Sequence, residues 1–217
     1  MARGKVSKAV VERLPGYYRY LCALEKMGMV RISSQQLGER MGLTASQIRQ
    51  DINCFGGFGQ QGYGYNVSEL RMRIGEILGL TREYHMIILG AGNIGRAIAN
   101  YESFRRMGFA VRALFDVRAD LLDSGAGGKP VLPMGALGEY LKRNSVDVGV
   151  VAVPDVAAQG VCDALVAGGV RAIWNFAPVT LSVPEGVAVE NVRLLDALLV
   201  LSYNMSNMPP AAGSGLN

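Results

Sequence analysis

The chain has 217 residues, of which 50% are apolar, 18% are charged and 28 are glycine. This composition supplies enough apolar material for a core and excludes a disordered chain or a small disulfide-stapled module. The charge is uneven: residues 1–80 carry 11 basic and 6 acidic side chains, whereas residues 81–217 carry 11 and 12. We therefore expect the basic first third and the near-neutral remainder to meet different partners.

Other whole-chain features mainly exclude classes of protein. The three cysteines, Cys22, Cys54 and Cys162, form no Cys-x-x-Cys pair, which favours reduced thiols over disulfides or a metal site. No apolar run follows the basic residues at the start, and no stretch approaches the ~18 apolar residues of a membrane helix. The expectation is a cytoplasmic protein with neither a metal nor a membrane partner.

The first third has the apolar spacing of helices. Over Leu14–Met29 apolar residues recur every three or four positions, which predicts an amphipathic helix with Pro15 in its first turn. Two shorter helices follow, and their N-cap candidates are Ser33-Ser34 for the first and Thr44 for the second. Helical spacing returns over residues 68–80.

The order of helix, short turn, helix and glycine-aromatic loop is typical of a winged helix-turn-helix. Residues Ser34–Met41 would form the first helix of this motif, Thr44–Cys54 the recognition helix and Gly56–Tyr65 the wing. The residues expected to face DNA are Ser34, Thr44, Ala45, Ser46, Gln47, Arg49 and Gln50. A small helical dimerisation domain with solvated charges is the alternative.

From residue 81 the pattern changes to short apolar strands that alternate with helices. The strongest strands are 86–89, 111–115, 146–153 and 172–176. Buried β-branched runs separated by helices predict a parallel sheet with helical crossovers. The last predicted helix, 193–205, carries an apolar stripe wider than a surface helix needs.

The most specific pattern is the turn after the first of these strands. Its residues form a Gly-x-Gly-x-x-Gly sequence and are Gly90, Ala91, Gly92, Asn93, Ile94 and Gly95. The three glycines allow a tight turn, a close approach to a pyrophosphate and close strand–helix packing. Asp116 follows the next strand, 21 residues after Gly95. That is the spacing of a ribose-binding carboxylate, which favours NAD(H) over NADP(H).

Groups for proton transfer are scarce around this turn. The only histidine, His85, precedes the first strand, and the lysines after residue 80, Lys129 and Lys142, follow no strong central strand. Two segments that leave strand ends, Val153–Gln159 and Asn175–Pro178, offer amide and apolar groups that suit binding a ring. These features favour a nucleotide sensor. An NAD-dependent oxidoreductase, a CoA-binding domain and an interaction module without DNA affinity are the alternatives.

Seven motifs, spread between Leu14 and Met205, recur together in a known family. They are Arg31-Ile-Ser-Ser-Gln-Gln-Leu37, Gln47-Ile-Arg-Gln-Asp51, Phe55-Gly-Gly-Phe-Gly-Gln-Gln-Gly-Tyr-Gly-Tyr-Asn-Val67, Gly90-Ala-Gly-Asn-Ile-Gly95, Val153-Pro154 with Ala158-Gln159, Asn175-Phe-Ala-Pro178 and Val189-Glu-Asn191. In this order they resemble Rex, a family of bacterial redox-sensing transcriptional repressors. The resemblance implies a non-enzymatic homodimer that binds a palindromic operator when NADH is scarce and releases it when NADH binds.

The resemblance also implies an α/β architecture in three parts. A winged helix-turn-helix domain would span residues 1–80, and a Rossmann-type doubly wound parallel-sheet domain that binds NADH or NAD⁺ would span residues 81–192. Residues 193–217 would form a C-terminal dimerisation helix and tail, with the helix exchanged between subunits.

Finally, the resemblance implies contacts that composition and spacing do not. The nucleotide contacts beyond the glycine turn and Asp116 would be Val153, Pro154, Gln159, Asn175, Phe176, Ala177 and Pro178. The wing contacts would be Gly59, Gln61 and Tyr63, although family wings often have a basic residue where this chain has Gln60-Gln61. In a polar switch of the family, an aspartate would change partner between the tyrosine that matches Tyr101 and the arginine that matches Arg19. This chain has Arg193 at that position, and Asp196, one helical turn later, is the candidate replacement.

Overall fold

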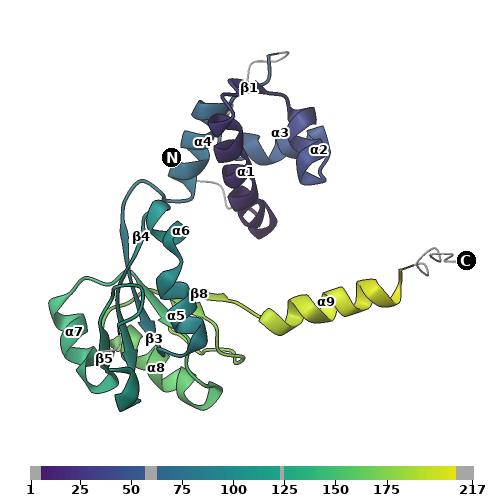
Figure 1. The fold of residues 1–217 in the computed structure, drawn as a ribbon. Helices are drawn as coiled ribbons and strands as arrows, with labels where there is room; N and C mark the ends of the chain where they lie inside the picture. Colours follow the sequence, from purple (N-terminus) through teal and green to yellow (C-terminus); the bar gives the residue numbers. More distant parts are fainter. Residues whose placement is uncertain (1–5, 57–62, 123–124, 209–217) are drawn as a thin grey trace, which may run out of the picture. The chain divides into compact units, whose positions relative to one another are not determined.

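The computed structural model describes residues 6–56, 63–122 and 125–208. The chain divides into two compact units, Met1–Arg82 and Glu83–Asn217, which Figure 1 shows at the two ends of the colour scale. The division falls two residues after the boundary expected at residue 80. Each unit is described by itself.

The first unit is a small helical domain with a two-stranded sheet. Its elements are α1 Lys8–Lys26, β1 Arg31–Ile32, α2 Ser34–Met41, α3 Ala45–Asn53, β2 Tyr65–Asn66 and α4 Val67–Ile77. Strands β1 and β2 pair antiparallel, with Ile32 opposite Tyr65. The fold confirms the predicted winged helix-turn-helix, in which α2 and α3 form the motif. Two of the predicted wing residues, Gly59 and Gln61, lie outside the described residues.

Local capping explains where α2 and α3 begin. The Ser33 hydroxyl accepts a hydrogen bond from the Gln36 backbone N–H at 3.1 Å, and the Gln36 side chain accepts one from the Ser33 N–H at 3.0 Å. This reciprocal capping box makes Ser33 the N-cap. Gly42 ends α2 in the left-handed conformation, with φ 66°. Two residues later, the Thr44 hydroxyl accepts from the Gln47 N–H at 3.1 Å and begins α3.

Helix α1 differs from its prediction at the start. It begins at Lys8, where the Ser7 side chain caps it, so Pro15 lies inside the helix instead of in the first turn. The apolar spacing did not reveal the first two turns because only Val10 among their residues is buried. Proline removes the hydrogen bond to the carbonyl of Val11. Both Pro15 and Val11 are exposed, so water can satisfy that carbonyl.

Helices from the whole of the first unit share one core. Buried side chains from every helix and both strands meet there, and they are Leu14, Tyr17, Leu21, Leu24, Ile32, Leu37, Ile48, Ile52, Tyr65, Val67, Leu70 and Ile74. Ile48 and Ile52 place one face of α3 in this core, which leaves the opposite face of α3 exposed.

The second unit is a parallel sheet covered by helices. Its elements are β3 Tyr84–Leu89, α5 Asn93–Asn100, α6 Glu102–Arg106, β4 Phe109–Asp116, η1 Ala119–Leu121, β5 Val131–Pro133, η2 Met134–Ala136, α7 Leu137–Arg143, β6 Val148–Val151, α8 Asp155–Ala167, β7 Ala172–Asn175, β8 Ala188–Asn191 and α9 Leu194–Ser206. The six strands lie in the order β5-β4-β3-β6-β7-β8, and every pair is parallel. This order confirms the predicted Rossmann-type, doubly wound sheet.

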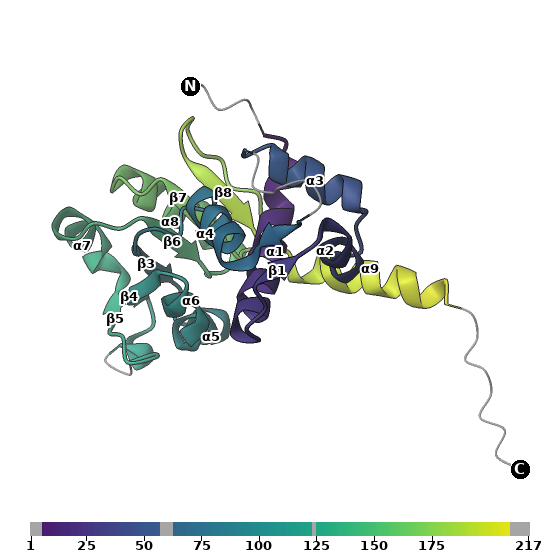
Figure 2. The same cartoon turned by 90° about the horizontal axis from the view of Figure 1, so that it is seen from above.

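Helices cover both faces of the sheet, as Figure 2 shows. Along β3 the side chains alternate: Ile87 and Leu89 enter a core that includes residues of α7 and α8. Met86 and Ile88 enter a second core, which receives Ile98 from α5 and Phe104 from α6. Because β3 packs against a core on each face, its residues form a continuous apolar run. That run is the pattern from which the strand was predicted.

Helix α9 differs from every other long helix because none of its residues is buried. Its large apolar side chains are 49–69% exposed and are Leu194, Leu195, Leu198, Leu199, Val200, Leu201, Tyr203 and Met205. An exposed apolar surface of this extent on a helix marks an interaction site. Among the described residues, no helix is both long and apolar enough to cross a bilayer.

The capping box predicts unequal roles for two adjacent serines. Ser33→Ala should lower the free energy of unfolding of the first unit by about 0.5–2 kcal/mol, because the Gln36 N–H loses the hydroxyl that accepts its hydrogen bond. Hydrogen exchange of the α2 amides checks this. The matched control, Ser34→Ala, should change it by less than half as much, and equal losses would contradict the assignment.

Candidate functional site

The carboxyl ends of the central strands meet at one edge of the sheet. Leu89 at the end of β3 lies opposite Phe115 of β4 and Val151 of β6. The hydrogen bonds continue one residue further: the Gly90 N–H donates to the Phe115 carbonyl at 2.7 Å, and the Ala152 N–H donates to the Leu89 carbonyl at 2.8 Å. Strand β4 lies on one side of β3, and β6 lies on the other. Because the strand order reverses at this point, a crevice opens at this edge of the sheet.

The glycine turn occupies this crevice and needs its glycines. Gly90 has φ +99°, and a Cβ on it would overlap the Ala152 carbonyl. A Cβ on Gly95 would overlap the carbonyl oxygen of Gly90, because α5 packs directly on the turn. Gly92 is the N-cap of α5, with no side-chain cap, and a Cβ there would meet no heavy atom within 4 Å. The start of α5 therefore faces open space.

A cleft of about 750 Å³ extends from the glycine turn. It is lined by Gly90, Gly92, Asn93, Ile94, Asp116, Val117, Arg118, Met134, Ala152, Val153, Pro154, Val156, Ala157 and Val161. Seven of the predicted nucleotide contacts are among these residues. The spacing arguments did not identify the apolar wall formed by Val117, Met134 and Val161, because it comes from segments that only the fold brings together.

Asp116 stands at the end of β4 with its carboxylate nearly buried. One oxygen accepts from the Ala91 N–H at 2.7 Å and the other from the Arg118 N–H at 2.9 Å. Burial alone would raise the pKa of Asp116, but these N–H groups outweigh it and hold the pKa below its usual range. Each carboxylate oxygen can still accept a further hydrogen bond. An acceptor that is charged at neutral pH suits the hydroxyls of a ribose and repels a phosphate.

The remaining predicted nucleotide contacts lie behind or beside the cleft. Ala91 and Gly95 are buried in the turn. Gln159 is held by the backbone of Ser182, from which it accepts at 2.9 Å and to which it donates at 2.9 Å. Asn175 is fully buried and donates to the Val179 carbonyl at 2.9 Å, which shapes the segment after β7.

That segment contains Phe176, Ala177 and Pro178. Ala177 is buried and Pro178 is exposed. The ring of Phe176 meets Trp174 edge to face, with centroids 4.7 Å apart. None of these three residues lines the cleft, although Phe176 packs against the core that contains Ala91 of the glycine turn.

The four residues of the predicted switch have different surroundings. Arg193 at the start of α9 donates to the carbonyls of Ala177 and, at 2.8 Å, Val179, so it fastens α9 to the segment after β7. Asp196 is exposed on the next turn. Tyr101, between α5 and α6, is 57% exposed and meets Phe104 edge to face. Arg19 is exposed on α1, in the other unit.

The exposed face of α3 carries most of the predicted DNA contacts. Ser46, Arg49 and Gln50 are exposed, and Thr44 and Ala45 stand at the start of the helix. The Arg49 guanidinium donates to the Ser34 hydroxyl of α2 at 3.1 Å. Near the wing, Tyr63 is 69% exposed, and its ring lies under the guanidinium of Arg31, 5.8 Å from the centroid.

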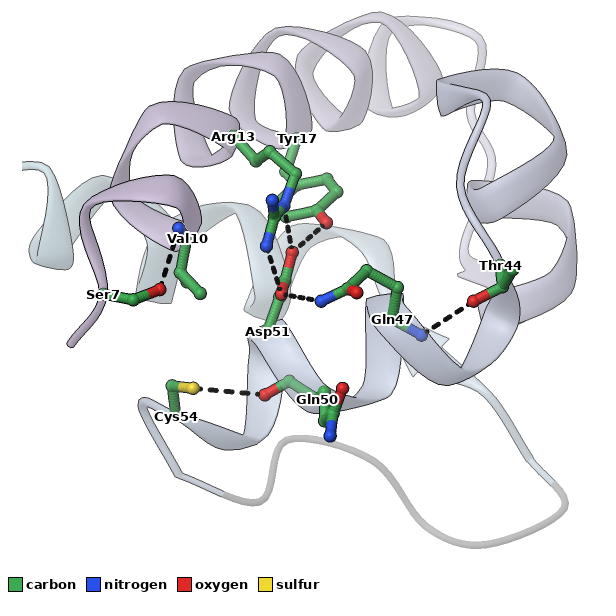
Figure 3. A network of polar contacts seen from close by, with 9 residues as sticks. All are labelled: Ser7, Val10, Arg13, Tyr17, Thr44, Gln47, Gln50, Asp51 and Cys54. Atoms are coloured by element: carbon green, nitrogen blue, oxygen red, sulfur yellow. Dashed lines mark hydrogen bonds and ion pairs between the residues drawn. The ribbon is translucent and has the colours of Figure 1, made fainter.

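A buried carboxylate that the sequence arguments missed lies on the other face of α3. Asp51 is fully buried and accepts from Arg13 at 2.6 and 2.8 Å, from Tyr17 at 2.6 Å and from Gln47 at 2.7 Å (Figure 3). Its position three residues after the inward Ile48 was a signal that it points into the core. We call these four residues, Arg13, Tyr17, Gln47 and Asp51, the brace, because they join α3 to α1.

No cluster of metal-binding side chains was found in the described parts of the chain. The prediction that His85 precedes the first strand is wrong. His85 is the second residue of β3, because the strand begins at Tyr84 and both residues pair with β4. It lies at the amino end of the sheet, where its ring contacts the Ser145 carbonyl at 3.2 Å. Leu89 and the glycine turn are at the opposite end of the strand.

Family models match both units. Residues 5–53 match the model described as "Putative DNA-binding protein N-terminus", and residues 81–179 match the "CoA binding domain". A winged helix-turn-helix followed by a Rossmann unit with an open glycine turn defines a class of DNA-binding regulators that respond to a nucleotide.

Relatives that align along nearly the whole chain identify the family. A redox-sensing transcriptional repressor Rex from Clostridium tetani is 55% identical over 93% of this chain and 95% of its own length. One from Clostridium kluyveri is 53% identical over 94% and 97%. The chain belongs to the Rex family of redox-sensing transcriptional repressors. These relatives are transcriptional regulators, so the oxidoreductase alternative is not supported, although residues 81–179 do match the CoA binding domain model.

Solved structures agree with this assignment. RSP in complex with beta-NAD⁺ and operator DNA has a TM-score of 0.89 and 49% identity, with 94% of both chains covered. RSP in complex with beta-NADH has a TM-score of 0.86 and 46% identity, and covers 94% of this chain and 95% of RSP.

The brace predicts a pH-dependent stability. Burial would raise the pKa of Asp51, but the hydrogen bonds from Arg13, Tyr17 and Gln47 outweigh it and hold the pKa below its usual range. A carboxyl whose pKa falls on folding stabilises the folded state above its unfolded pKa of about 3.9, and this contribution is lost as the pH falls further. At neutral pH Asp51→Asn should lower the free energy of unfolding of the first unit by about 3 kcal/mol, the low end for a buried pair.

The predicted loss of stability in Asp51→Asn lies at the low end of the range because the Arg13 side chain remains 28% exposed. Urea unfolding followed by hydrogen exchange of the α3 amides, at pH values from 2 to 7, measures the difference between wild type and variant. The difference should shrink below pH 4. A difference that stays constant with pH would contradict a charged Asp51.

Proposed function

We propose that this protein binds operator DNA through α3 and the wing, binds NADH or NAD⁺ in the cleft at the end of β3, and releases DNA when NADH binds. One observation carries the proposal most directly. The cleft at the glycine turn is open and ends at a charged Asp116, in a chain whose other unit exposes a polar recognition helix. The complexes of RSP with beta-NAD⁺ and operator DNA, and with beta-NADH, support it.

For the nucleotide, the chain offers groups for each chemical part. The first turn of α5, beginning at Asn93 and Ile94, presents backbone N–H groups and the positive end of the helix dipole to a pyrophosphate. Asp116 accepts from the adenosine ribose, and Val153 and Pro154 form an apolar wall. When bound, NADH supplies a neutral nicotinamide where NAD⁺ supplies a cationic one, and the wall favours the neutral ring.

For DNA, Ser34 and Thr44 stand at helix starts and suit phosphates, whereas Ser46, Arg49 and Gln50 suit base edges in a major groove. Tyr63, near the end of the predicted wing, is exposed and would contact the duplex. Arg49 is the one arginine on α3, and it suits the guanine edge. A two-fold dimer would then bind a palindromic operator with half-sites separated by whole helical turns.

The protein acts as a homodimer in this proposal, and α9 makes the contact. Its apolar side chains are exposed all around the helix, so a partner that buries them must surround it. A second copy of the chain can do so by accepting α9 between its own elements. Arg193 fastens the start of α9 to the segment after β7, so a change near that segment reaches the dimer contact.

Operator binding measured against the NADH/NAD⁺ ratio tests the proposal. A palindromic duplex selected from a random library by the wild-type protein is labelled, and its affinity is followed by anisotropy at constant total nucleotide. Replacing NAD⁺ with NADH should weaken operator binding by about 5- to 150-fold, the range of allosteric couplings. An affinity independent of the ratio, or steady consumption of NADH with small carbonyl substrates, would contradict it.

The Asp116 carboxylate predicts cofactor preference. Asp116→Asn keeps the shape of the side chain but removes the charge, so NADH affinity should fall by about tenfold or more, the strength of a charged hydrogen bond. NADPH affinity should fall less or rise, because Arg118 beside it then faces the 2′-phosphate. Quenching of Trp174, the only tryptophan, reports binding of both nucleotides.

The matched control for this variant is Asp120→Asn. Asp120 is exposed in the nearby 3₁₀ turn Ala119–Leu121 and does not line the cleft. This control should leave both affinities unchanged. An unchanged preference for NADH over NADPH in Asp116→Asn would remove Asp116 from the ribose site.

A further inference from the structure

The brace bears on which residues of α3 can read DNA bases. Arg13 contributes Nε to one Asp51 oxygen and Nη2 to the other, at 2.6 and 2.8 Å. The Tyr17 hydroxyl donates to the first oxygen at 2.6 Å, and Gln47 Nε2 donates to the second at 2.7 Å. Each carboxylate oxygen thus has two donors, which is its full capacity. With a side chain only 1% exposed, Asp51 has no water to replace a donor that leaves.

Gln47 is committed to this arrangement at two points. Its backbone N–H donates to the N-cap hydroxyl of Thr44 at 3.1 Å, and its side-chain amide donates to Asp51. A glutamine that reads adenine uses both its amide nitrogen and its amide oxygen on one base edge. Gln47 Nε2 carries two hydrogens, and one of them is donated to Asp51. That bond keeps the whole amide on the inner side of α3, turned away from the side on which Gln50 lies (Figure 3), so a two-point contact with a base requires the bond to Asp51 to break. Reading a base would leave a buried carboxylate oxygen short of one donor.

Gln50 has the opposite orientation. Its side chain is exposed and points away from the brace in Figure 3, and its neighbour Arg49 is exposed as well. The two glutamines of α3 are three residues apart in the sequence, yet one faces Asp51 and the other faces outward. Chemically equal side chains are therefore available to DNA to different degrees.

We infer that Asp51 is a positioning residue for operator recognition, and that Gln47 belongs to the brace and reads no base. The carboxylate holds α3 on α1 and keeps the Gln47 amide on the inner side of the helix. Base reading by α3 is left to Gln50 and Arg49. This inference rests on the proposed function, because it concerns how the same helix recognises an operator.

Selection from a random duplex library tests it with the full-length protein. Wild type, Gln47→Ala and Gln50→Ala are each used to select duplexes, and the enriched sequences are compared. Gln47→Ala should enrich the wild-type sequence. Gln50→Ala should lose preference at one or two base pairs, where discrimination falls by about 5- to 150-fold. If the duplexes enriched by Gln47→Ala lack a base preference that the wild-type protein shows, the inference is overturned.

A double-mutant cycle separates positioning from base reading. Gln47→Ala and Asp51→Asn should each weaken binding to all duplexes by a similar factor, and Gln47→Ala should have no further effect in the Asp51→Asn background. A Gln47→Ala effect that persists undiminished in that background would show that Gln47 acts on DNA independently. Ile74→Val, a core substitution in α4 away from the brace, controls for lost stability and should leave operator affinity unchanged.

The two failures are distinguishable. If wild type enriches no sequence at all, the proposed function falls, and the inference falls with it. If wild type enriches a palindrome but Gln47→Ala enriches an altered one, only the inference falls. Hydrogen exchange of α3 at the assay temperature verifies that each variant is folded.

Discussion

At the end of β3 the chain turns so tightly that only three residues separate the last strand residue, Leu89, from Asn93 at the start of α5. The turn is possible because Gly95 lets the helix rest on the Gly90 carbonyl, and because Gly90 has a positive φ. Everything else at the cleft depends on this close approach. It aims the start of α5 at open space, and it brings the Ala91 N–H within reach of Asp116 on the neighbouring strand. Together with the Arg118 N–H, this Ala91 N–H holds the pKa of the carboxyl below its usual range.

Each unit uses buried polar contacts to hold the element for which we propose a contact with a partner. In the first unit the brace fixes α3, and in the second Arg193 and Asn175 fix the segment after β7 and the start of α9. A buried carboxylate with all of its donors in place adds a directional constraint to apolar packing, because moving a donor away leaves a buried polar group unsatisfied. A repressor that must be switched by a small molecule needs rigid parts joined by a few adjustable contacts.

Much of the fold was predictable because its signals are local. The capping residues, the apolar runs of the central strands and the glycine turn depend on neighbours in the sequence, so α2, α3 and β3 were expected within one or two residues. The edge strands β5 and β8 were not: β5 is three residues long and ends in Pro133, and most of β8 is exposed, so neither has an apolar run. The early start of α1 was missed because its first turns bury only Val10.

The site was predictable where one short motif forms it and obscure where distant segments do. The turn and Asp116 follow from spacing, but Val117, Met134 and Val161 meet only after the sheet has formed. The brace needed a pairing between α1 and α3, across 38 residues, that no periodicity reveals. Likewise, Gln47 faces inward because it donates to Asp51, whereas Gln50 faces outward. The residue type is the same at both positions and does not reveal this difference.

The central claim is that DNA binding and NADH binding are opposed within one molecule. Thermodynamic linkage makes the opposition reciprocal, so operator DNA must weaken NADH binding by the factor by which NADH weakens operator binding. Titrating NADH against the full-length protein with and without saturating operator, and following Trp174 fluorescence, measures that factor directly. The account predicts a weaker NADH affinity in the presence of operator, and equal affinities in the two titrations would contradict it.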